Sequence, residues 1–495
     1  MPKTKRSLKH SRIRTLDGDD DQSRHAGAGR AKTERRKALK ILFCASECYP
    51  FAKSGGLADV AYALPKALAK KEDVTLMLPW YRFMDLGGLD LKLSFKTRIE
   101  LGEKGYEVAY REGSFEKIRV VFVKTPPLYE SRTLYDEPQN DLRFALFSKA
   151  IADFVQKERF DILHLNDWHT ALAALWVKER PLDLKVVFTI HNLAFQGIFP
   201  AGRLEKLGID RRYFDMEWLE YYGQINFMKA GIAFCDALTT VSPTYAREIL
   251  TPEFGCGLEG YLQKYRHKLS GILNGIDTRT FDPRKDPLIA CSMKRKIVTF
   301  KACNKRVFLK QKTDLPLFVY IGRLTEQKGI DLLLSLAEKL AGSPLIFAFL
   351  GEGDETMQKA LRQIAGGAPN LLCNLGYDEK RARQMYAAAD FLVMPSRFEP
   401  CGLNQMIAMR YAAVPVVHRT GGLADTVHTK SGRCGRGIVF EKMSKEALWE
   451  AIEAALGLYR HKERLEKIRA FDMACDFSFE KPAKAYLRLY ARLRA

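Results

Sequence analysis

The sequence predicts an α/β protein made of two parallel-sheet domains. Its 495 residues exceed what one hydrophobic core usually supports. Short apolar runs alternate with segments whose apolar residues recur at helical spacing, and this alternation occurs twice along the chain. Strands separated by helices of such length are typical of parallel α/β sheets. The string Gly-Gly-Leu-Ala-Asp at 55–59 recurs at 421–425, once in each predicted domain, and each copy is expected to open a helix.

The first domain is predicted at residues 39–270. It begins with an apolar run at 39–44, a glycine loop, a helix with Leu57, Val60 and Leu64 on one face, and a second apolar run at 74–78. These elements form a strand–helix–strand unit. The pattern returns with strands expected at 161–165 and 186–190.

The second domain is predicted at residues 271–476, after a join near 270–283. Strands are expected at 317–321, 345–350, 391–394 and 414–417. A single helix with Leu333, Leu336 and Leu340 on one face is expected after the first of them. The last segment, 477–495, is predicted to be a helix that completes the first domain.

The chain carries a large positive charge, because 80 Lys and Arg stand against 59 Asp and Glu, a net charge of +21. Such a chain is expected to meet an anion, whether nucleic acid, a membrane surface or a phosphorylated small molecule. Residues 1–40 contribute +8 of the excess. Residues 1–38 are polar and lack periodicity, so we predict a disordered basic tail there.

Several classes of protein are excluded. No apolar stretch reaches the roughly 18 residues that cross a bilayer, and residues 1–40 lack the apolar core of a secretory signal. The ten cysteines are scattered without a C-x-x-C pair, so we expect no metal site and predict reduced thiols in a cytoplasmic protein. No nucleic-acid-binding motif occurs, and a nucleic-acid partner is not expected.

Two motifs place cations beside glycine at predicted strand ends. Lys53 precedes Gly56 in a loop where glycine lets the backbone approach a phosphate, although a tight turn with a surface lysine fits equally well. Arg323 and Lys328 flank a turn directly after an apolar strand, where ligands bind in open α/β sheets. Arginine grips phosphate as a fork and lysine acts as a point charge, but a solvated basic loop is the alternative.

Polar residues also follow other predicted strands. The string at 396–404 presents Glu399 beside proline and glycine, an arrangement that can offer a carboxylate and amides to sugar hydroxyls or form a simple surface turn. Asp167 and His191 end two neighbouring strands, together with His164 and His169. We expect these clusters to form the floor of a pocket. A lone histidine, however, is often a core residue whose ring nitrogens are hydrogen-bonded within the protein.

Taken together, these strings resemble the bacterial glycogen synthase and plant starch synthase family of retaining glycosyltransferases. The resemblance covers about residues 39–490. Its motifs occur here at Lys53–Val60, His164–His169, Ile190–Gly197, Leu273–Asp277, Arg323–Gly329, Ser396–Leu403 and Arg419–Val427. Asn404 departs from the family pattern, which has threonine at this position. The resemblance implies a GT-B fold, in which two Rossmann-like doubly wound domains face each other across a cleft.

The resemblance also implies roles for individual residues. Those expected to contact the donor diphosphate are Lys53, the Gly56 amide, Arg323 and Lys328. Those expected to contact the transferred glucose are Glu399, the amides of Cys401 and Gly402, the adjoining Leu403, His191 and Asn274. Asp167 is expected near the sugar and the acceptor, and Tyr377 is expected to stack on the nucleotide base.

The implied reaction is transfer of glucose from ADP-glucose to the non-reducing 4-hydroxyl of an α-1,4-glucan such as glycogen or starch, with retention of configuration and without a cofactor or metal. We expect Asp167, His191, Arg323, Lys328 and Glu399 to carry the catalysis. Three alternatives stay open: a UDP-glucose-dependent enzyme, a phosphorylase acting on glucose 1-phosphate, and a catalytically silent protein that binds glucan or nucleic acid.

Overall fold

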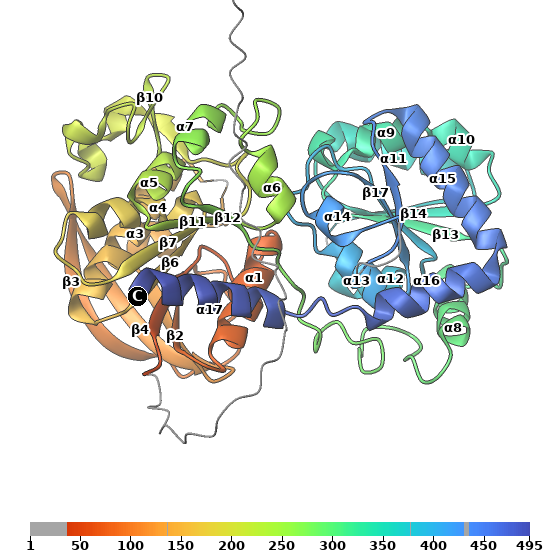
Figure 1. Ribbon diagram of the computed structural model, residues 1–495, viewed down its shortest axis with the longest axis horizontal. Helices are drawn as coiled ribbons and strands as arrows, with labels where there is room; N and C mark the ends of the chain where they lie inside the picture. Colours follow the sequence, from red (N-terminus) through yellow and green to blue (C-terminus); the bar gives the residue numbers. More distant parts are fainter. Residues whose placement is uncertain (1–36, 136, 377, 430–434) are drawn as a thin grey trace, which may run out of the picture.

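The computed structural model describes residues 37–495, apart from residues 136, 377 and 430–434 (Figure 1). Within this range the chain forms two α/β domains that lie side by side, each around its own sheet. The predicted two-domain α/β fold is therefore confirmed. The basic tail predicted at 1–38 falls almost entirely outside the described residues. None of the described helices has the length and apolarity needed to span a membrane.

The first domain contains a nine-stranded sheet in the order β12-β11-β7-β6-β1-β2-β5-β4-β3. Strands β12 to β5 of this order run parallel, whereas β4 pairs antiparallel with both β5 and β3 at one edge. The strands are β1 (Lys40–Cys44), β2 (Asp73–Pro79), β3 (Lys92–Leu101), β4 (Lys104–Phe115), β5 (Ile118–Lys124), β6 (Ile162–Asn166), β7 (Lys185–Ile190), β11 (Ala237–Thr240) and β12 (Leu269–Gly271). The four strands expected here are all present.

Helices cover this sheet because each buries an apolar face on it. In α1 (Gly56–Leu68), for example, Leu57, Val60 and Leu64 are buried as their spacing predicts. The other helices are α2 (Pro126–Tyr129), α3 (Asn140–Lys157), α4 (Trp168–Lys178), α5 (Phe227–Phe234), α6 (Pro243–Glu248) and α7 (Glu259–Lys264), with short 3-10 turns at Ala201–Arg203, Glu205–Leu207 and Arg211–Tyr213. A small antiparallel sheet joins β8 (Ile198–Pro200), β10 (Gln224–Asn226) and β9 (Glu220–Tyr221).

The second domain contains a six-stranded parallel sheet in the order β15-β14-β13-β16-β17-β18. Its strands are β13 (Leu317–Ile321), β14 (Ile346–Gly351), β15 (Leu371–Leu375), β16 (Phe391–Met394), β17 (Val414–His418) and β18 (Ile438–Phe440). Its helices are α8 (Ile297–Leu309), α9 (Ile330–Ser335), α10 (Ala337–Ala341), α11 (Glu355–Gly367), α12 (Glu379–Ala388), α13 (Asn404–Arg410), α14 (Gly421–Thr426), α15 (Lys445–Arg460) and α16 (Lys462–Ala474).

One predicted helix of the second domain is interrupted. The segment after β13 ends α9 at Ser335 and begins α10 at Ala337, although Leu333, Leu336 and Leu340 are all buried. The Ser335 hydroxyl donates to the Leu332 carbonyl, a local bond that competes with regular helical bonding. The apolar pattern therefore predicted the buried face correctly and the continuity of the helix wrongly.

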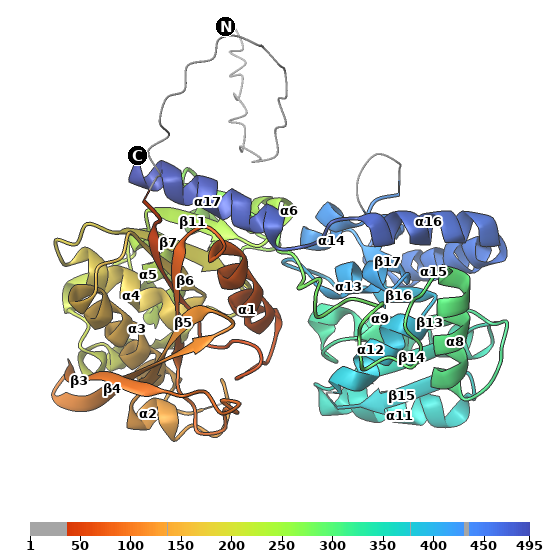
Figure 2. The same cartoon turned by 90° about the horizontal axis from the view of Figure 1, so that it is seen from below.

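The two domains are joined by two chain segments that lie side by side (Figure 2). Residues 272–296 lead from β12 into the second domain, and the chain returns before α17 (Glu480–Arg494). The Ile276 amide donates to the Phe477 carbonyl at 2.7 Å, which fastens one crossing to the other. Helix α17 packs against α1, and the Tyr490 hydroxyl lies 2.6 Å from His164 Nδ1 on β6. The last helix thus belongs structurally with the first sheet.

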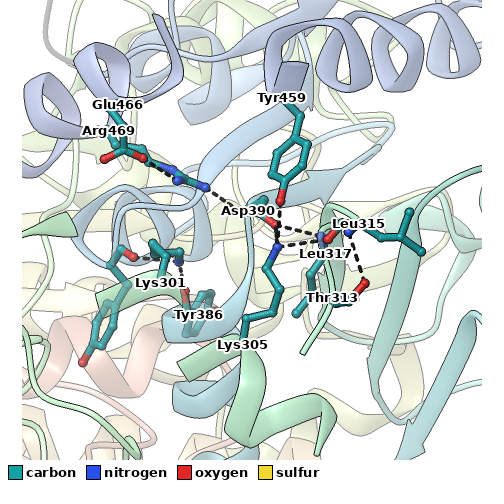
Figure 3. Close-up of polar contacts among 11 residues, drawn as sticks. Lys301, Lys305, Thr313, Leu315, Leu317, Tyr386, Asp390, Tyr459, Glu466 and Arg469 are labelled. Atoms are coloured by element: carbon teal, nitrogen blue, oxygen red, sulfur yellow. Dashed lines mark hydrogen bonds and ion pairs between the residues drawn. The ribbon is translucent and has the colours of Figure 1, made fainter. Parts of the chain in front are cut away.

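A buried ionic cluster holds α8 and α16 against the second sheet (Figure 3). Asp390, just before β16, pairs with Lys305 Nζ at 2.5 Å and with Arg469 Nη2 at 2.6 Å. It also accepts the Leu317 amide. Burial alone would raise the pKa of Asp390, yet the two cations hold it below its usual range. Lys301 is also buried and donates to the Tyr386 and Tyr411 carbonyls.

The cysteines differ from the expectation in one place. Cys291 and Cys303, in the crossing segment and α8, form a disulfide. The prediction of reduced thiols was therefore wrong for Cys291 and Cys303. Seven other cysteines form no disulfide in the described part of the chain, and five of them are buried.

Candidate active site

Asp167 and His191 meet at the carboxyl ends of neighbouring strands β6 and β7. The Asp167 Oδ1 atom accepts the His191 amide at 2.7 Å, and His191 Nε2 lies 2.9 Å from Asn166 Oδ1. Asp167 also precedes α4 with a left-handed φ of 57°, a strained conformation for a non-glycine residue that is often found at functional sites. The structure therefore brings these two predicted site residues together.

Burial controls the charge of this group. Desolvation raises the pKa of Asp167 to about 7, although the His191 and Asn192 amides oppose the shift. Burial likewise lowers the pKa of His191 to about 3, so its ring is neutral at neutral pH. His164 is different: its ring lies between the Tyr490 and Thr189 hydroxyls in the core, which makes it a satisfied core histidine.

The glycine loop before α1 contains a buried acid that the sequence motif did not reveal. Glu47, just after β1, accepts the Ser54 amide at 2.5 Å, and burial raises its pKa to about 7. Lys53 pairs with Asp59 at 2.8 Å, and each of these two side chains is 25% exposed. Asp59, the last residue of the first Gly-Gly-Leu-Ala-Asp string, thus holds the Lys53 ammonium beside the loop.

Arg323, Lys328 and Glu399 gather at the carboxyl ends of β13 and β16. Lys328 Nζ lies 2.8 and 2.6 Å from the two carboxylate oxygens of Glu399. The Ser396 hydroxyl donates to the same carboxylate at 3.0 Å. Arg323 is exposed, and its guanidinium lies 5.8 Å from the ring of Phe195 in the first domain. A cation and a carboxylate from separate strand ends therefore meet where the sequence predicted a ligand site.

The turn after Glu399 rests directly on the backbone of α14. The Gly422 amide donates to the Glu399 carbonyl at 3.0 Å. Gly421 has a φ of 43°, and a Cβ atom there would lie 2.0 Å from the same carbonyl. Gly402 also adopts a left-handed conformation, with a φ of 70°. Glycine is thus required at 421 by both conformation and space.

Two contacts join this turn to the rest of the site. Burial raises the pKa of the Cys401 thiol to about 12, and the Asn274 backbone amide beside the sulfur opposes the shift. Asn404, where the family has threonine, donates from its side chain to the Ile321 carbonyl at 2.7 Å. This bond ties the start of α13 to the end of β13.

Residues from both domains face each other at this site. A Cβ atom on Gly56 would lie 3.7 Å from the Leu403 side chain, so the two glycine-rich turns approach across the domain boundary. On α6, the Glu248 carboxylate accepts the Gly421 amide at 2.9 and 3.0 Å. Thr244 donates its amide and hydroxyl to Asp425 on α14, at 2.9 and 2.7 Å. These contacts hold the domains together in this conformation.

The second copy of the Gly-Gly-Leu-Ala-Asp string opens a helix, α14, as predicted. Its first amide binds a carboxylate of the other domain, because Glu248 accepts the Gly421 amide. Sequence reasoning missed Glu248 and Glu47 because neither belongs to a motif with a known chemical role. Tyr377 lies outside the described residues. Among the residues that are described, no group of three or more His, Cys, Asp or Glu side chains is arranged to hold a metal ion.

The chain matches two family models. Residues 40–264 match the starch synthase catalytic domain, and residues 304–469 match glycosyl transferases group 1. A glycogen synthase of Geotalea daltonii is 41% identical over 91% of this chain and 98% of its own length. The chain belongs to the glycogen and starch synthase family. A glycogen synthase 2 of Nitrosococcus oceani is 39% identical over 92% of this chain and 97% of its own length.

A solved structure shows the same architecture for a family member. The catalytic domain of starch synthase IV from Arabidopsis thaliana, bound to ADP and acarbose, superposes with a TM-score of 0.86. It is 31% identical and covers 92% of this chain and all of its own chain. The GT-B fold predicted for this chain, a member of the glycogen and starch synthase family, is therefore confirmed.

Proposed function

We propose that this chain transfers glucose from ADP-glucose to the non-reducing 4-hydroxyl of an α-1,4-glucan, with retention of configuration. The observation that carries the proposal is the contact between Lys328 and both oxygens of Glu399 at the carboxyl edge of the second sheet. It brings a cation suited to a diphosphate next to a carboxylate suited to sugar hydroxyls. Membership of the glycogen and starch synthase family supports the reaction class.

ADP is the proposed nucleotide of the donor. The related starch synthase IV structure contains ADP and acarbose, a nucleotide and an oligosaccharide analogue, and it shares 31% identity with this chain. On this basis Lys53, the Gly56 amide, Arg323 and Lys328 would hold the diphosphate, and Tyr377 would stack on the base. We propose that the transferred glucose contacts Glu399, the 401–403 turn, His191 and Asn274.

The proposed chemistry relies on electrostatic stabilisation of the leaving diphosphate. Retention by double displacement needs a positioned carboxylate nucleophile. Asp167 is a poor candidate, because its Oδ1 atom is bound to the His191 amide and its pKa is raised to about 7. We propose instead a front-face attack, in which the glucan hydroxyl bonds to the anomeric carbon as the diphosphate leaves. The diphosphate takes the hydroxyl proton, and Lys328 and Arg323 stabilise its charge.

Lys328 is proposed to keep its contact with Glu399 when the donor binds. Lys328 has three N–H donors, so it can retain Glu399 and gain a phosphate oxygen at the same time. Glu399 is buried, with 7% of its side chain exposed, and Ser396 fixes one of its oxygens. A fixed carboxylate can orient a sugar hydroxyl without losing its own position. Asp167 would lie near the acceptor.

A comparison of three donors tests the proposal. The purified full-length protein is incubated with glycogen and, in separate reactions, radiolabelled ADP-glucose, UDP-glucose or glucose 1-phosphate. We expect incorporation from ADP-glucose at the highest kcat/KM. Preference for UDP-glucose would replace the proposed donor, preference for glucose 1-phosphate would indicate a phosphorylase, and glucan binding without incorporation from any donor would indicate a silent homologue.

The proposed domain bounds are 39–270 together with 477–495 for the first domain and 271–476 for the second. The packing of α17 on α1 supports the assignment of the last helix. A cytoplasmic location, without a membrane partner, stays part of the proposal.

A further inference from the structure

A cavity lies in the second domain, away from the candidate active site. Its volume is about 530 Å³, within the usual range for small-molecule sites, and it is bounded by β17, β18, α15 and α16. Val414 begins β17 and Ile438 begins β18, and both line the cavity. The cavity is therefore at the amino ends of these strands, whereas Glu399 follows the carboxyl end of β16.

Basic side chains dominate the polar lining of this cavity. His428 and Arg436 come from two segments joined by a parallel β-bridge. His461, Arg464 and Lys467 follow one another at spacings of three residues along the start of α16, so they share one face of this helix. In the described part of the chain, no Asp or Glu lines the cavity.

Two acidic groups lie near the cavity, and each is bound to another residue of the protein. Glu466 pairs with Arg469 at 2.7 Å, and Asp472 accepts the Arg436 backbone amide at 2.6 Å. The Arg436 guanidinium stacks on the ring of Phe471 at 4.0 Å, and its buried Nε atom has no hydrogen-bond partner among the described residues. Stacking fixes this cation in place. Asp472 also interacts electrostatically with Arg436 and offsets part of its charge. Arg464 and Lys467 make no ion pair among the described residues, so they supply the positive charge that is left at the cavity.

The remaining lining is apolar. Ile438, Leu458 and Ile468 contribute to the walls. A ligand that matches this cavity therefore has a compact body and an anionic group that can accept several charged hydrogen bonds. Phosphate fits best, because its oxygens accept from arginine, lysine and histidine together. A concentrated group of cations also accounts for part of the positive charge outside residues 1–40, which the active site alone does not explain.

We propose that this cavity binds a small phosphate-bearing metabolite and regulates the reaction. The regulatory part rests on the proposed function. His428 follows the end of α14 by two residues, and α14 carries Gly421 and Asp425, which bind Glu248 and Thr244 of the first domain. A ligand that binds the His428 side chain therefore contacts the segment directly after the helix that joins the two domains. Because the donor is proposed to bind residues of both domains, a change in how the domains meet alters the KM for the donor.

Calorimetric titration of the full-length protein with inorganic pyrophosphate tests the binding. Saturating ADP is present throughout to occupy the proposed donor site. The variant is Arg464→Glu with Lys467→Glu, two exposed residues that make no ion pair among the described residues. Its matched control is Lys312→Glu with Lys359→Glu, which makes the same change of charge on exposed positions outside the cavity lining. We expect binding at least tenfold weaker in the first variant and unchanged in the control.

Two calorimetric outcomes would overturn the site. One is pyrophosphate binding of equal strength in wild type and Arg464→Glu/Lys467→Glu. The other is an equal loss in both double variants, which would indicate a general effect of charge. A gel shift with random duplex DNA gives a third outcome that would overturn the site. If DNA binds to wild type and not to Arg464→Glu/Lys467→Glu, while pyrophosphate does not bind, this face is a nucleic-acid surface instead.

Steady-state kinetics test the regulation separately. The KM for ADP-glucose is measured with and without pyrophosphate in wild type and in Arg464→Glu/Lys467→Glu. Competition between pyrophosphate and the donor raises the KM equally in both proteins. A change in KM that occurs in wild type and not in the variant therefore measures regulation through the cavity. We expect to observe such a change. An identical response in both would contradict regulation. Inactivity of the wild type with every donor would refute the proposed function, whereas the calorimetric result would still decide the binding site.

Discussion

The Glu248 carboxylate of the first domain accepts the Gly421 amide of the second domain, at 2.9 and 3.0 Å. The loop before α1 repeats this arrangement, since Glu47 accepts the Ser54 amide. Each glycine-led turn thus presents its first amides to a carboxylate of the protein. Burial raises the pKa of both Glu47 and Glu248, so each carboxylate is desolvated in this conformation. The second copy of the string therefore contributes to packing between the domains, whereas the loop of the first copy binds a carboxylate of its own domain.

Removal of Glu248 is expected to weaken donor binding. Hydrogen bonds to a charged group contribute about 1.5 to 3 kcal/mol, and part of this is offset because Glu248 is partly buried. We therefore expect Glu248→Ala to raise the KM for ADP-glucose by about tenfold, with a smaller effect on kcat. Steady-state kinetics with glycogen measure both constants. Glu253→Ala, which removes an exposed acid on the loop after α6, should behave as wild type. A KM for Glu248→Ala equal to that of this control would show that the contact does not support donor binding.

The buried Asp167 is expected to make stability depend on pH. Its pKa is about 7 in the folded protein and about 3.8 when unfolded, so the folded state binds the extra proton between these values. Folding stability then decreases as pH rises from about 4 to 7, by an amount on the order of 4 kcal/mol. Asp167→Asn cannot ionise, so it should be more stable than wild type at pH 8 and lose this advantage towards pH 4.

Urea unfolding of Asp167→Asn and wild type at a series of pH values measures this effect. Asp90→Asn, at an exposed position with 85% of its side chain accessible, is the control and should follow wild type. A constant difference between Asp167→Asn and wild type across pH 4 to 8 would contradict the raised pKa. The same variant should lose activity if Asp167 lies beside the acceptor.

The ionic cluster around Asp390 is expected to stabilise the fold of the second domain and to have no effect on donor binding. Asp390→Ala would leave Lys305 and Arg469 buried without their shared carboxylate, which typically costs about 3 to 5 kcal/mol. We expect a correspondingly lower urea midpoint and an unchanged KM for the donor at 25 °C. Glu100→Ala breaks the exposed pair with Arg98 and should change stability by less than about 1 kcal/mol. Equal effects of the two substitutions would show that the buried cluster has no special role.

Much of the fold could be predicted because its central strands are continuous apolar runs. The strands at Lys40–Cys44 and Leu317–Ile321, for example, are buried between helices on both faces and therefore lack polar interruptions. The edge strands could not be predicted in this way. In β3, Lys92 and Lys96 alternate with apolar residues, because this strand is largely exposed at the end of the sheet. Short β18 and β12 have too few residues to give a pattern.

The site was predictable where a motif lay at a strand end. Lys328 and Glu399 are 71 residues apart, yet parallel strands bring their carboxyl ends to the same edge, as expected from the predicted alternation. The disulfide of Cys291 and Cys303 depends on how a connecting segment folds over α8, which has no signal in the sequence. Glu248 was missed for a similar reason, because its partner is a backbone amide of the other domain.

The most direct test of the account is glucosyl transfer by Lys328→Ala. Loss of a cation that stabilises a leaving diphosphate should lower kcat with ADP-glucose and glycogen by about 10² to 10³-fold. Lys359→Ala, an exposed lysine of the same domain, is the matched control and should retain full activity. Urea unfolding of both variants checks that they are folded. A folded Lys328→Ala protein that retains more than about a tenth of the wild-type kcat would contradict the proposed diphosphate clamp.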